Sequence, residues 1–290
     1  MPRLVCWWSA GIASSVASAV ALTGSGDYEE KIVAYCDTSS SEHPDNARFL
    51  AECEHWYGQP ILRLRSTAYR DTWEVFEKTR WLVGVAGARC TTELKKLVRR
   101  AFERPDDVHV FGFTADEPER AERFRKNNPE IDARFPLLEA GLKHADCAAL
   151  LQKAGIEIPL MYRLGYRNNN CIGCVKGGAG YWNKIRRDFP ETFDRMAKVE
   201  RSLNAAILKK TIGGKRLRVF LDELDPRSGK YEAEEAVECG LACGSTLTGI
   251  EAAGGSVRRD VGPARRDDRD DAEREDEPRG GATDMPAARA

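Results

Sequence analysis

The alternation of short apolar runs with longer amphipathic segments is the feature that most constrains the fold of this chain. The apolar runs, which predict β-strands, lie at residues 4–8, 31–35, 61–64 and 108–113. The amphipathic segments between them, which predict helices, include residues 46–57 and 91–102. Strand, helix and strand at this spacing are typical of a parallel sheet covered by helices on both faces. The sequence therefore predicts an α/β fold with a doubly wound parallel sheet.

Composition excludes several classes of protein. The chain has 290 residues, of which 42% are apolar and 31% charged. No window approaches the ~18 consecutive apolar residues of a transmembrane helix, so we expect no membrane contact. Because the first residues run directly into a predicted strand, without the apolar region of a signal peptide, we expect a cytoplasmic location. The net charge of −1 excludes a strong overall attraction to nucleic acid, although a local basic patch is compatible with it.

The C-terminal end of the chain has a different composition. From residue 257 onward it contains no aromatic, Leu or Ile residue, and charges of both signs fill more than half of the positions. Such a segment buries too little apolar area to offset its ordering entropy, which predicts a disordered tail. A tail that binds a partner is the alternative.

The turn after the first predicted strand has the composition of a phosphate-binding loop. Ser9, Gly11 and Ser14 lie in a run of small residues between this strand and a helix of small residues at 16–22. Such a turn exposes backbone N–H groups and the positive end of a helix dipole, which together attract an anion. It is neither a Walker motif nor Gly-x-Gly-x-x-Gly. The alternative interpretation is a tight turn that serves packing only.

Polar residues also follow the second and fourth predicted strands. Asp37 and Thr38 come after the second strand, and Arg120 comes shortly after the fourth. Ligands of such sheets bind beyond the carboxyl ends of the strands, where these residues would meet the phosphate loop. The pattern predicts a binding site at that edge.

The order of four short motifs resembles the phosphoadenosine phosphosulfate (PAPS) reductase family of the PP-loop, or adenine nucleotide alpha-hydrolase, superfamily. The motifs are Ser-x-Gly-x-x-Ser at 9–14, Asp-Thr at 37–38, Cys-Thr-x-x-Leu-Lys at 90–95 and Gly-x-x-x-x-Glu-x-x-Arg at 112–120. The resemblance spans residues 4–245 and implies an adenine nucleotide alpha-hydrolase-like, Rossmann-like domain.

The resemblance also implies roles for single residues. Ser9, Gly11 and Ser14 would hold phosphate, and Asp37 and Thr38 would lie near the adenosine. Arg120 and Lys95 would face the phosphate or sulfate end of the nucleotide, with a plain surface cation as the alternative for each. Ala13 stands where ATP-cleaving members carry an acidic residue, which favours sulfur chemistry over ATP hydrolysis.

Six of the nine cysteines fall into two groups. Cys6, Cys36, Cys53 and Cys147 stand alone in apolar or helical patterns, which predicts packing roles. Cys171 and Cys174 instead form a glycine-rich Cys-x-x-Cys turn that suits a metal ion or two corners of a cluster. A redox pair and plain packing are the alternatives.

The remaining thiols are interpreted through the resemblance. It implies a [4Fe–4S] cluster held by Cys90, Cys171, Cys174 and Cys243, with a Cys₄ zinc site as the alternative. Arg89 replaces a second cysteine that iron–sulfur members carry beside Cys90. Cys239, in Glu-Cys-Gly-Leu, matches the reductase nucleophile, while Ala242 replaces the histidine that follows it in the family. The opposite assignment, with Cys239 as ligand and Cys243 free, stays open.

Basic residues gather in three runs on segments expected to be helical. The runs are Lys95, Lys96, Arg99 and Arg100; Lys184, Arg186 and Arg187; and Lys209, Lys210, Lys215 and Arg216. Solvated helix faces are one interpretation, and a nucleic-acid footprint is the other.

Taken with the resemblance, these observations predict a PAPS or adenylyl-sulfate reductase-like oxidoreductase that works with a thioredoxin-like thiol donor or a sulfur carrier. One alternative is an ATP pyrophosphatase and sulfurtransferase that adenylates DNA or tRNA, and another is a nucleotide sensor without catalysis. The expected organisation is a nucleotide-binding domain at 1–165, a cysteine-rich cluster-binding region at 166–250 and a disordered tail at 251–290.

Overall fold

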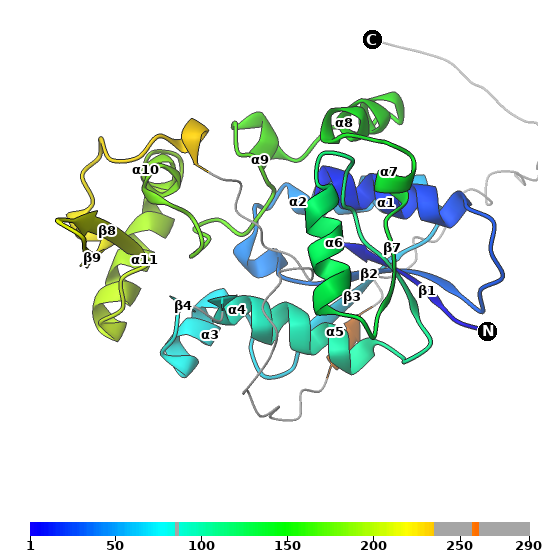
Figure 1. Cartoon of the computed structure of the whole chain (residues 1–290), viewed down its shortest axis with the longest axis horizontal. Coiled ribbons are helices and arrows are strands. Elements are labelled where there is room, and N and C mark those ends of the chain that lie inside the picture. The colour runs from blue at the N-terminus through cyan, green and yellow to red at the C-terminus, as the bar shows by residue number, and fades with distance from the viewer. Residues whose placement is uncertain (85–86, 235–256, 261–290) are drawn as a thin grey trace, which may run out of the picture.

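A mainly parallel six-stranded sheet forms the centre of the protein (Figure 1). The computed structural model describes residues 1–84, 87–234 and 257–260. The strand order is β10-β3-β2-β1-β6-β7, in which only β10 runs antiparallel to its neighbour. These strands are β1 (Leu4–Trp8), β2 (Lys31–Cys36), β3 (Ile61–Ser66), β6 (Val108–Val110), β7 (Asp132–Arg134) and β10 (Val257–Asp260).

Helices cover both faces of this sheet. Alternate residues of β1 point to opposite sides, so its apolar side chains reach both faces and pack against helices there. Leu4, Cys6 and Trp8 belong to a core that is shared with α1, α2, α7 and α8, whereas Val5 and Trp7 pack with α5 and α6. These helices are α1 (Ile12–Thr23), α2 (Asn46–Tyr57), α5 (Leu97–Phe102), α6 (Pro118–Asn127), α7 (Pro136–Glu139) and α8 (His144–Lys153). The predicted α/β sheet with helices on both faces is confirmed.

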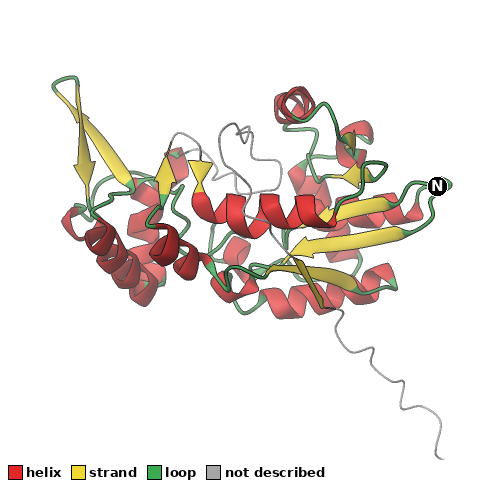
Figure 2. Cartoon of the chain, turned by 90° about the horizontal axis from the view of Figure 1, so that it is seen from below, coloured by secondary structure: helices red, strands yellow, loops and turns green. Residues whose placement is uncertain are grey.

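A second lobe lies beside the sheet and has its own apolar core (Figures 1 and 2). This core combines side chains from residues 69–94 with side chains from residues 161–231. The helical elements of this part of the chain are α3 (Thr72–Thr79), α4 (Arg89–Thr91), η2 (Thr92–Lys96), α9 (Leu160–Arg163), α10 (Ala179–Asp188), α11 (Pro190–Leu203), η3 (Leu221–Glu223) and η4 (Tyr231–Ala233). Its strand pairs are β4 (Val83–Gly84) with β5 (Gly87–Ala88) and β8 (Leu208–Ile212) with β9 (Lys215–Val219). A 3-10 turn, η1 (Ser39–Ser41), follows β2.

Several elements differ from the sequence prediction. The fourth predicted strand, 108–113, ends at Val110, because Gly112 leaves the sheet to pack against the backbone of α1. Residues 257–260, which the composition places in the tail, pair with β3 as an edge strand. This strand is held by an ion pair between Asp260 and Arg65 and by Arg259, whose guanidinium lies 5.2 Å from the ring centre of Phe102.

The basic runs also depart from the prediction. Lys95, Lys96 and Arg99 are buried, because their segment is covered by the sheet on one side and by the second core on the other. The run at 209–216 lies on the β8–β9 hairpin and not on a helix. Within the described residues, no helix combines the length and the apolar character needed to cross a membrane.

Candidate functional site

The turn after β1 closes on itself through serine hydroxyl groups. The Ser14 hydroxyl accepts a hydrogen bond from the Ser9 backbone N–H at 3.1 Å and donates to the Gly11 carbonyl at 3.0 Å. The Ser9 hydroxyl lies 3.0 Å from the same Ser14 oxygen. Ala10 adopts a left-handed conformation, with φ of 58°, which reverses the chain before α1 begins. The turn therefore presents the first N–H groups of a twelve-residue helix at the carboxyl edge of the sheet.

Two neighbours fit closely against this turn. A Cβ atom at Gly112 would stand 2.6 Å from the Ser14 nitrogen, so only glycine permits this approach of β6 to α1. The Tyr162 hydroxyl lies 3.4 Å from the position of a Cβ atom at Gly11. Burial raises the pKa of Tyr162 to about 12, against hydrogen bonds from the N–H groups of Ile12 and Asn169. Tyr162 thus packs against the start of α1, next to Gly11.

Asp37 lies at the end of β2 and is bound on both oxygens. One oxygen accepts from the Ser39 N–H at 2.9 Å, and the other accepts from the Arg65 guanidinium at 2.7 and 2.8 Å. Burial acts to raise the pKa of Asp37, but the hydrogen bonds from Ser39 and Arg65 outweigh it and hold that pKa below its ordinary value. Asp37 is therefore a fixed carboxylate that positions Arg65 in the wall of the polar cavity described below.

Thr38 belongs to a buried polar network around Glu42. One Glu42 oxygen accepts from the Thr38 hydroxyl at 2.6 Å. The other accepts from the Tyr35 hydroxyl at 2.7 Å and from the Asn46 amide at 2.9 Å. The network fixes the β2–α2 connection next to the phosphate loop, which gives Thr38 a supporting role in the site.

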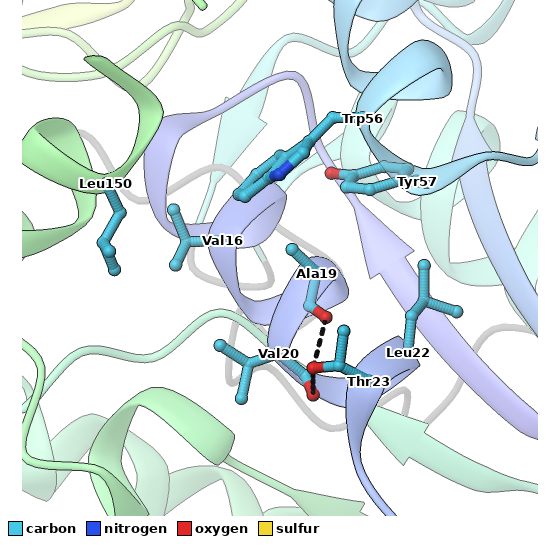
Figure 3. A pocket seen from close by; sticks show the side chains of 8 residues that line it. All are labelled: Val16, Ala19, Val20, Leu22, Thr23, Trp56, Tyr57 and Leu150. Atoms are coloured by element: carbon cyan, nitrogen blue, oxygen red, sulfur yellow. Dashed lines mark hydrogen bonds between the residues drawn. The ribbon is translucent and has the colours of Figure 1, made fainter. Parts of the chain in front are cut away.

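A cavity of about 630 Å³ opens beside these residues. Its lining is polar and charged and comes from the segments that follow β2 and β3, together with Leu94. The lining includes Asp37, Ser39, Ser40, Arg65, Tyr69, Arg70, Glu74 and Lys78. A smaller hollow of about 250 Å³ on the outer side of α1 is walled by Val16, Trp56, Tyr57 and Leu150 and is largely apolar (Figure 3). Of these two cavities, the first carries charged groups, and none of its lining residues belongs to the turn at 9–14.

Arg120 lies beyond β6, at the same edge of the sheet. Its guanidinium pairs with Glu117 at 2.5 Å and stands 4.7 Å from the ring centre of Phe113. Glu117 in turn lies near the Thr114 hydroxyl, at 3.4 Å, and its charge adds to the raised pKa of Tyr162. The structure therefore brings Arg120 to the phosphate-loop side of the sheet as part of an ion pair.

The Cys-x-x-Cys turn is wrapped around Tyr181, whose hydroxyl accepts from the N–H groups of Gly173 at 3.1 Å and Cys174 at 2.9 Å. Cys174 is buried and Cys171 is partly exposed. Gly173 has a φ of 77°, and a Cβ there would meet Thr192 at 2.7 Å. The turn is thus a compact bend seated on the second core.

Two contacts tie this cysteine turn to the predicted nucleotide loops. The Ile172 N–H donates to the Ser41 carbonyl at 2.9 Å. The Asn169 amide donates to the Ala10 carbonyl at 2.6 Å and to the Asn46 side-chain oxygen at 2.7 Å. Segments about 160 residues apart in the sequence therefore meet at one edge of the sheet.

The sequence analysis did not single out Asn169, Asn46 or Glu42. Asn169 is 5% exposed, and its side-chain oxygen has no hydrogen-bond partner among the described residues. The run Asn168-Asn169-Asn170 before the Cys-x-x-Cys turn was the available signal, since three amides in succession are unusual in an apolar neighbourhood.

Three of the four predicted metal ligands, Cys90, Cys171 and Cys174, lie within the described residues. Cys90 packs against the same second core as Cys174. No group of three His, Cys, Asp or Glu side chains that could hold a metal ion occurs in the described ranges. Cys239 and Cys243 lie outside the described residues. The three described thiols are thus an incomplete donor set.

The other predicted residues have clear positions. Lys95 is buried at the end of the π-helical turn η2, where its carbonyl lies 3.6 Å from the Cys36 sulfur. The packing role predicted for Cys6, Cys36, Cys53 and Cys147 is confirmed by their burial. Burial raises the pKa of Cys6 and Cys36 to about 12 and of Cys53 and Cys147 to about 11, so these thiols stay protonated near neutral pH.

The fold and this edge define a mixed α/β protein with a candidate anion-binding loop where parallel strands end, compatible with a Rossmann-like fold. No protein-family model matches the chain, and no curated protein matches its sequence.

Proposed function

We propose that the protein binds an adenine nucleotide at the carboxyl edge of the sheet and carries out sulfur chemistry on it with a cysteine thiolate. The observation that carries the proposal is the pair of contacts that hold the cysteine turn on the nucleotide loops, Asn169 to Ala10 and Ile172 to Ser41. A phosphate loop and a thiol-bearing segment at one edge suit transfer of sulfur from an activated nucleotide.

The reaction we favour is the release of sulfite from PAPS or adenylyl sulfate. Cys239, outside the described residues, is the proposed nucleophile. Its thiolate attacks the sulfonyl sulfur, a sulfur–sulfur bond forms, and the sulfur–oxygen bond breaks so that the nucleotide leaves as its phosphate. A dithiol donor then reduces the resulting thiosulfonate, which releases sulfite and regenerates the cysteine as the donor becomes a disulfide.

The test compares nucleotides on the full chain purified without oxygen. PAPS, adenylyl sulfate and ATP are each supplied with reduced thioredoxin, and sulfite is measured. We expect sulfite from one of the two sulfated nucleotides and its loss in Cys239→Ser. The matched control is Cys147→Ser, which removes a thiol that lies in the core of the sheet domain. Absence of sulfite in the wild type, together with no effect of Cys239→Ser, would overturn the proposal.

A second candidate is an ATP-dependent sulfurtransferase that adenylates nucleic acid, and the exposed basic residues of the β8–β9 hairpin favour it. It predicts pyrophosphate release from ATP that DNA or RNA stimulates. Nucleotide binding without turnover under either assay would instead indicate a sensor.

A further inference from the structure

The structure separates the three basic runs of the sequence. In the first run, Lys95, Lys96 and Arg99 are buried at 9%, 7% and 3% exposure, so they do not form a basic surface. In the second, Lys184 and Arg187 pair with Asp188 at 2.8 and 2.9 Å. The third run therefore differs from the others, because it lies on a two-stranded ribbon that projects from the second lobe (Figure 2).

The hairpin carries one sign of charge only. Residues 208–219 contain five cations and no acidic residue, in a chain whose net charge is −1. Two glycines at the tip, Gly213 with φ of 55° and Gly214 with φ of 78°, allow the tight turn that joins the strands. The cations flank this turn on both strands: Lys209, Lys210, Lys215, Arg216 and Arg218, all of them exposed.

The register places three of these cations on one face. Lys209 is opposite Arg218, and Thr211 is opposite Arg216. Since residues two apart on a strand share a face, Lys209, Arg216 and Arg218 form a cationic face with Thr211. Like charges directly opposite each other destabilise a hairpin, so this arrangement has a cost that an anion bound between the strands would remove.

These cations are not neutralised within the described part of the chain. None of the five forms an ion pair with a carboxylate there. Lys210 alone is near enough to an acid, Asp225, to help lower the pKa of that carboxyl. Arg218 donates to the Asn204 carbonyl at 3.1 Å, which orients its guanidinium without neutralising it.

We propose that the β8–β9 hairpin docks on the phosphodiester backbone of double-stranded DNA through the face of Lys209, Arg216 and Arg218. A narrow two-stranded ribbon with cations on one face fits into the major groove of DNA, which admits such a ribbon and is bordered by phosphates. Few side chains other than cations are available on this face, so the contact is to backbone charge and not to base sequence. The inference does not depend on the chemistry at the carboxyl edge of the sheet.

The test measures binding by the full chain without nucleotide. Fluorescein-labelled duplexes of about 20 base pairs, roughly two turns, are titrated while anisotropy is recorded over a range of salt. One arm uses DNA of two unrelated sequences and the other uses RNA, which distinguishes the two kinds of duplex. We expect both DNA duplexes to bind in the micromolar range at low salt, with no sequence preference and with a steep loss of affinity as salt rises, and RNA to bind more weakly.

A double variant, Lys209→Gln with Arg216→Gln, removes two cations and leaves the Arg218 contact to Asn204. Affinity should fall about tenfold, and the slope of log Kd against log salt should decrease by about 2, as expected when two phosphate contacts are lost. Lys126→Gln with Lys153→Gln is the matched control, because both residues are exposed on the sheet lobe and the charge change is the same. That control should bind like the wild type, and thermal unfolding of both variants verifies folding.

Two results would overturn the proposal. The first is equal affinity and equal salt slope for the hairpin variant and its control. The second is a wild-type protein that binds neither DNA nor RNA but binds an acidic peptide with the sequence of residues 266–278. That result would assign the hairpin to an intramolecular contact with its own C-terminal segment.

Discussion

At the scale of single residues, the polar groups of the site act first as structural anchors. Asp37 and Thr38 were predicted from their place after a strand, and both lie at the expected edge. The long-range hydrogen bonds of the site could not be predicted. Arg65 is 28 residues from its partner Asp37, and Asn169 is 123 residues from its partner Asn46. Residue type and strand position thus indicate where a site is, whereas the hydrogen bonds that fix it depend on tertiary contacts between distant segments.

Gly112 gives the sharpest single-residue prediction. In Gly112→Ala the new Cβ would stand 2.6 Å from the Ser14 nitrogen and 2.7 Å from its Cα, so strand and helix must separate. We expect the free energy of unfolding to fall by about 1–3 kcal/mol, the usual cost of overpacking. Nucleotide affinity should fall as well, because the turn at Ser9–Ser14 shifts. Urea unfolding and a nucleotide titration measure the two effects.

The matched control is Gly24→Ala at the other end of α1. Gly24 has a φ of −64°, and its nearest contact would be an ordinary 3.4 Å. This variant should keep wild-type stability and nucleotide affinity. Equal stability of Gly112→Ala and Gly24→Ala would show that β6 and α1 are not in this close contact.

At the scale of elements, the apolar pattern of the sequence predicts the regular strands of the sheet correctly. The first three predicted strands and the helix Asn46–Tyr57 form as expected, because their apolar periodicity matches the face they bury. The β8–β9 hairpin was taken for a helical basic face, since its alternation is weak and its turn is marked only by Gly-Gly. The segment 91–102 is helical as predicted, but its basic face is wrong as a prediction, because Lys95, Lys96 and Arg99 are buried by packing that no local pattern reveals.

Glu200 on α11 anchors the hairpin and makes its anchorage sensitive to pH. It is fully buried, and its two oxygens accept from the N–H groups of Ile207 and Leu221, each at 2.6 Å, on either side of the hairpin. Burial raises the pKa of Glu200 to about 7, despite those hydrogen bonds. The native state therefore retains a proton on Glu200 in a range where the unfolded state, with its ordinary pKa of about 4.5, has lost it.

The sign of the pH effect follows from this difference. The contribution of Glu200 is fully present below about pH 4.5 and is lost as pH rises through about 7, a decrease of up to about 3 kcal/mol. Urea unfolding at a series of pH values should show this decrease in the wild type and not in Glu200→Gln, which cannot titrate. Parallel pH profiles of the two proteins would contradict the prediction.

At the scale of the whole molecule, the sheet domain and the second lobe meet at the candidate site. The core of the second lobe takes side chains from residues 69–94 as well as from 161–231, so chain on both sides of the predicted boundary at 165 contributes to it. The sequence could not show this, because the crossing depends on packing between segments at least 67 residues apart. This packing matters for the candidate site, because the second lobe holds the cysteine turn next to the loops that follow β1 and β2.

The placement of Cys90 and Cys174 on the core of this lobe leads to a prediction about metal. Cys90 and Cys174 pack on the same core, and the donors are thiols, which suit iron–sulfur clusters or zinc. We expect the protein purified without oxygen to be brown, with absorbance near ~400 nm and about four irons per chain. Iron analysis and the absorption spectrum check this expectation on the full chain.

Cysteine variants then distinguish the cysteines that bind the cluster from those that do not. Cys171→Ala and Cys174→Ala should each abolish the colour and lower the melting temperature, because loss of a ligand removes metal-linked stability. Cys147→Ala, a buried thiol of the sheet core, should stay brown and lose only packing energy. Of the C-terminal pair, Cys243→Ala should bleach the protein and Cys239→Ala should leave it brown but inactive. A colourless wild type with one zinc per chain would refute the cluster and leave the nucleotide proposal untouched, since the loop at Ser9–Ser14 is built without any thiol.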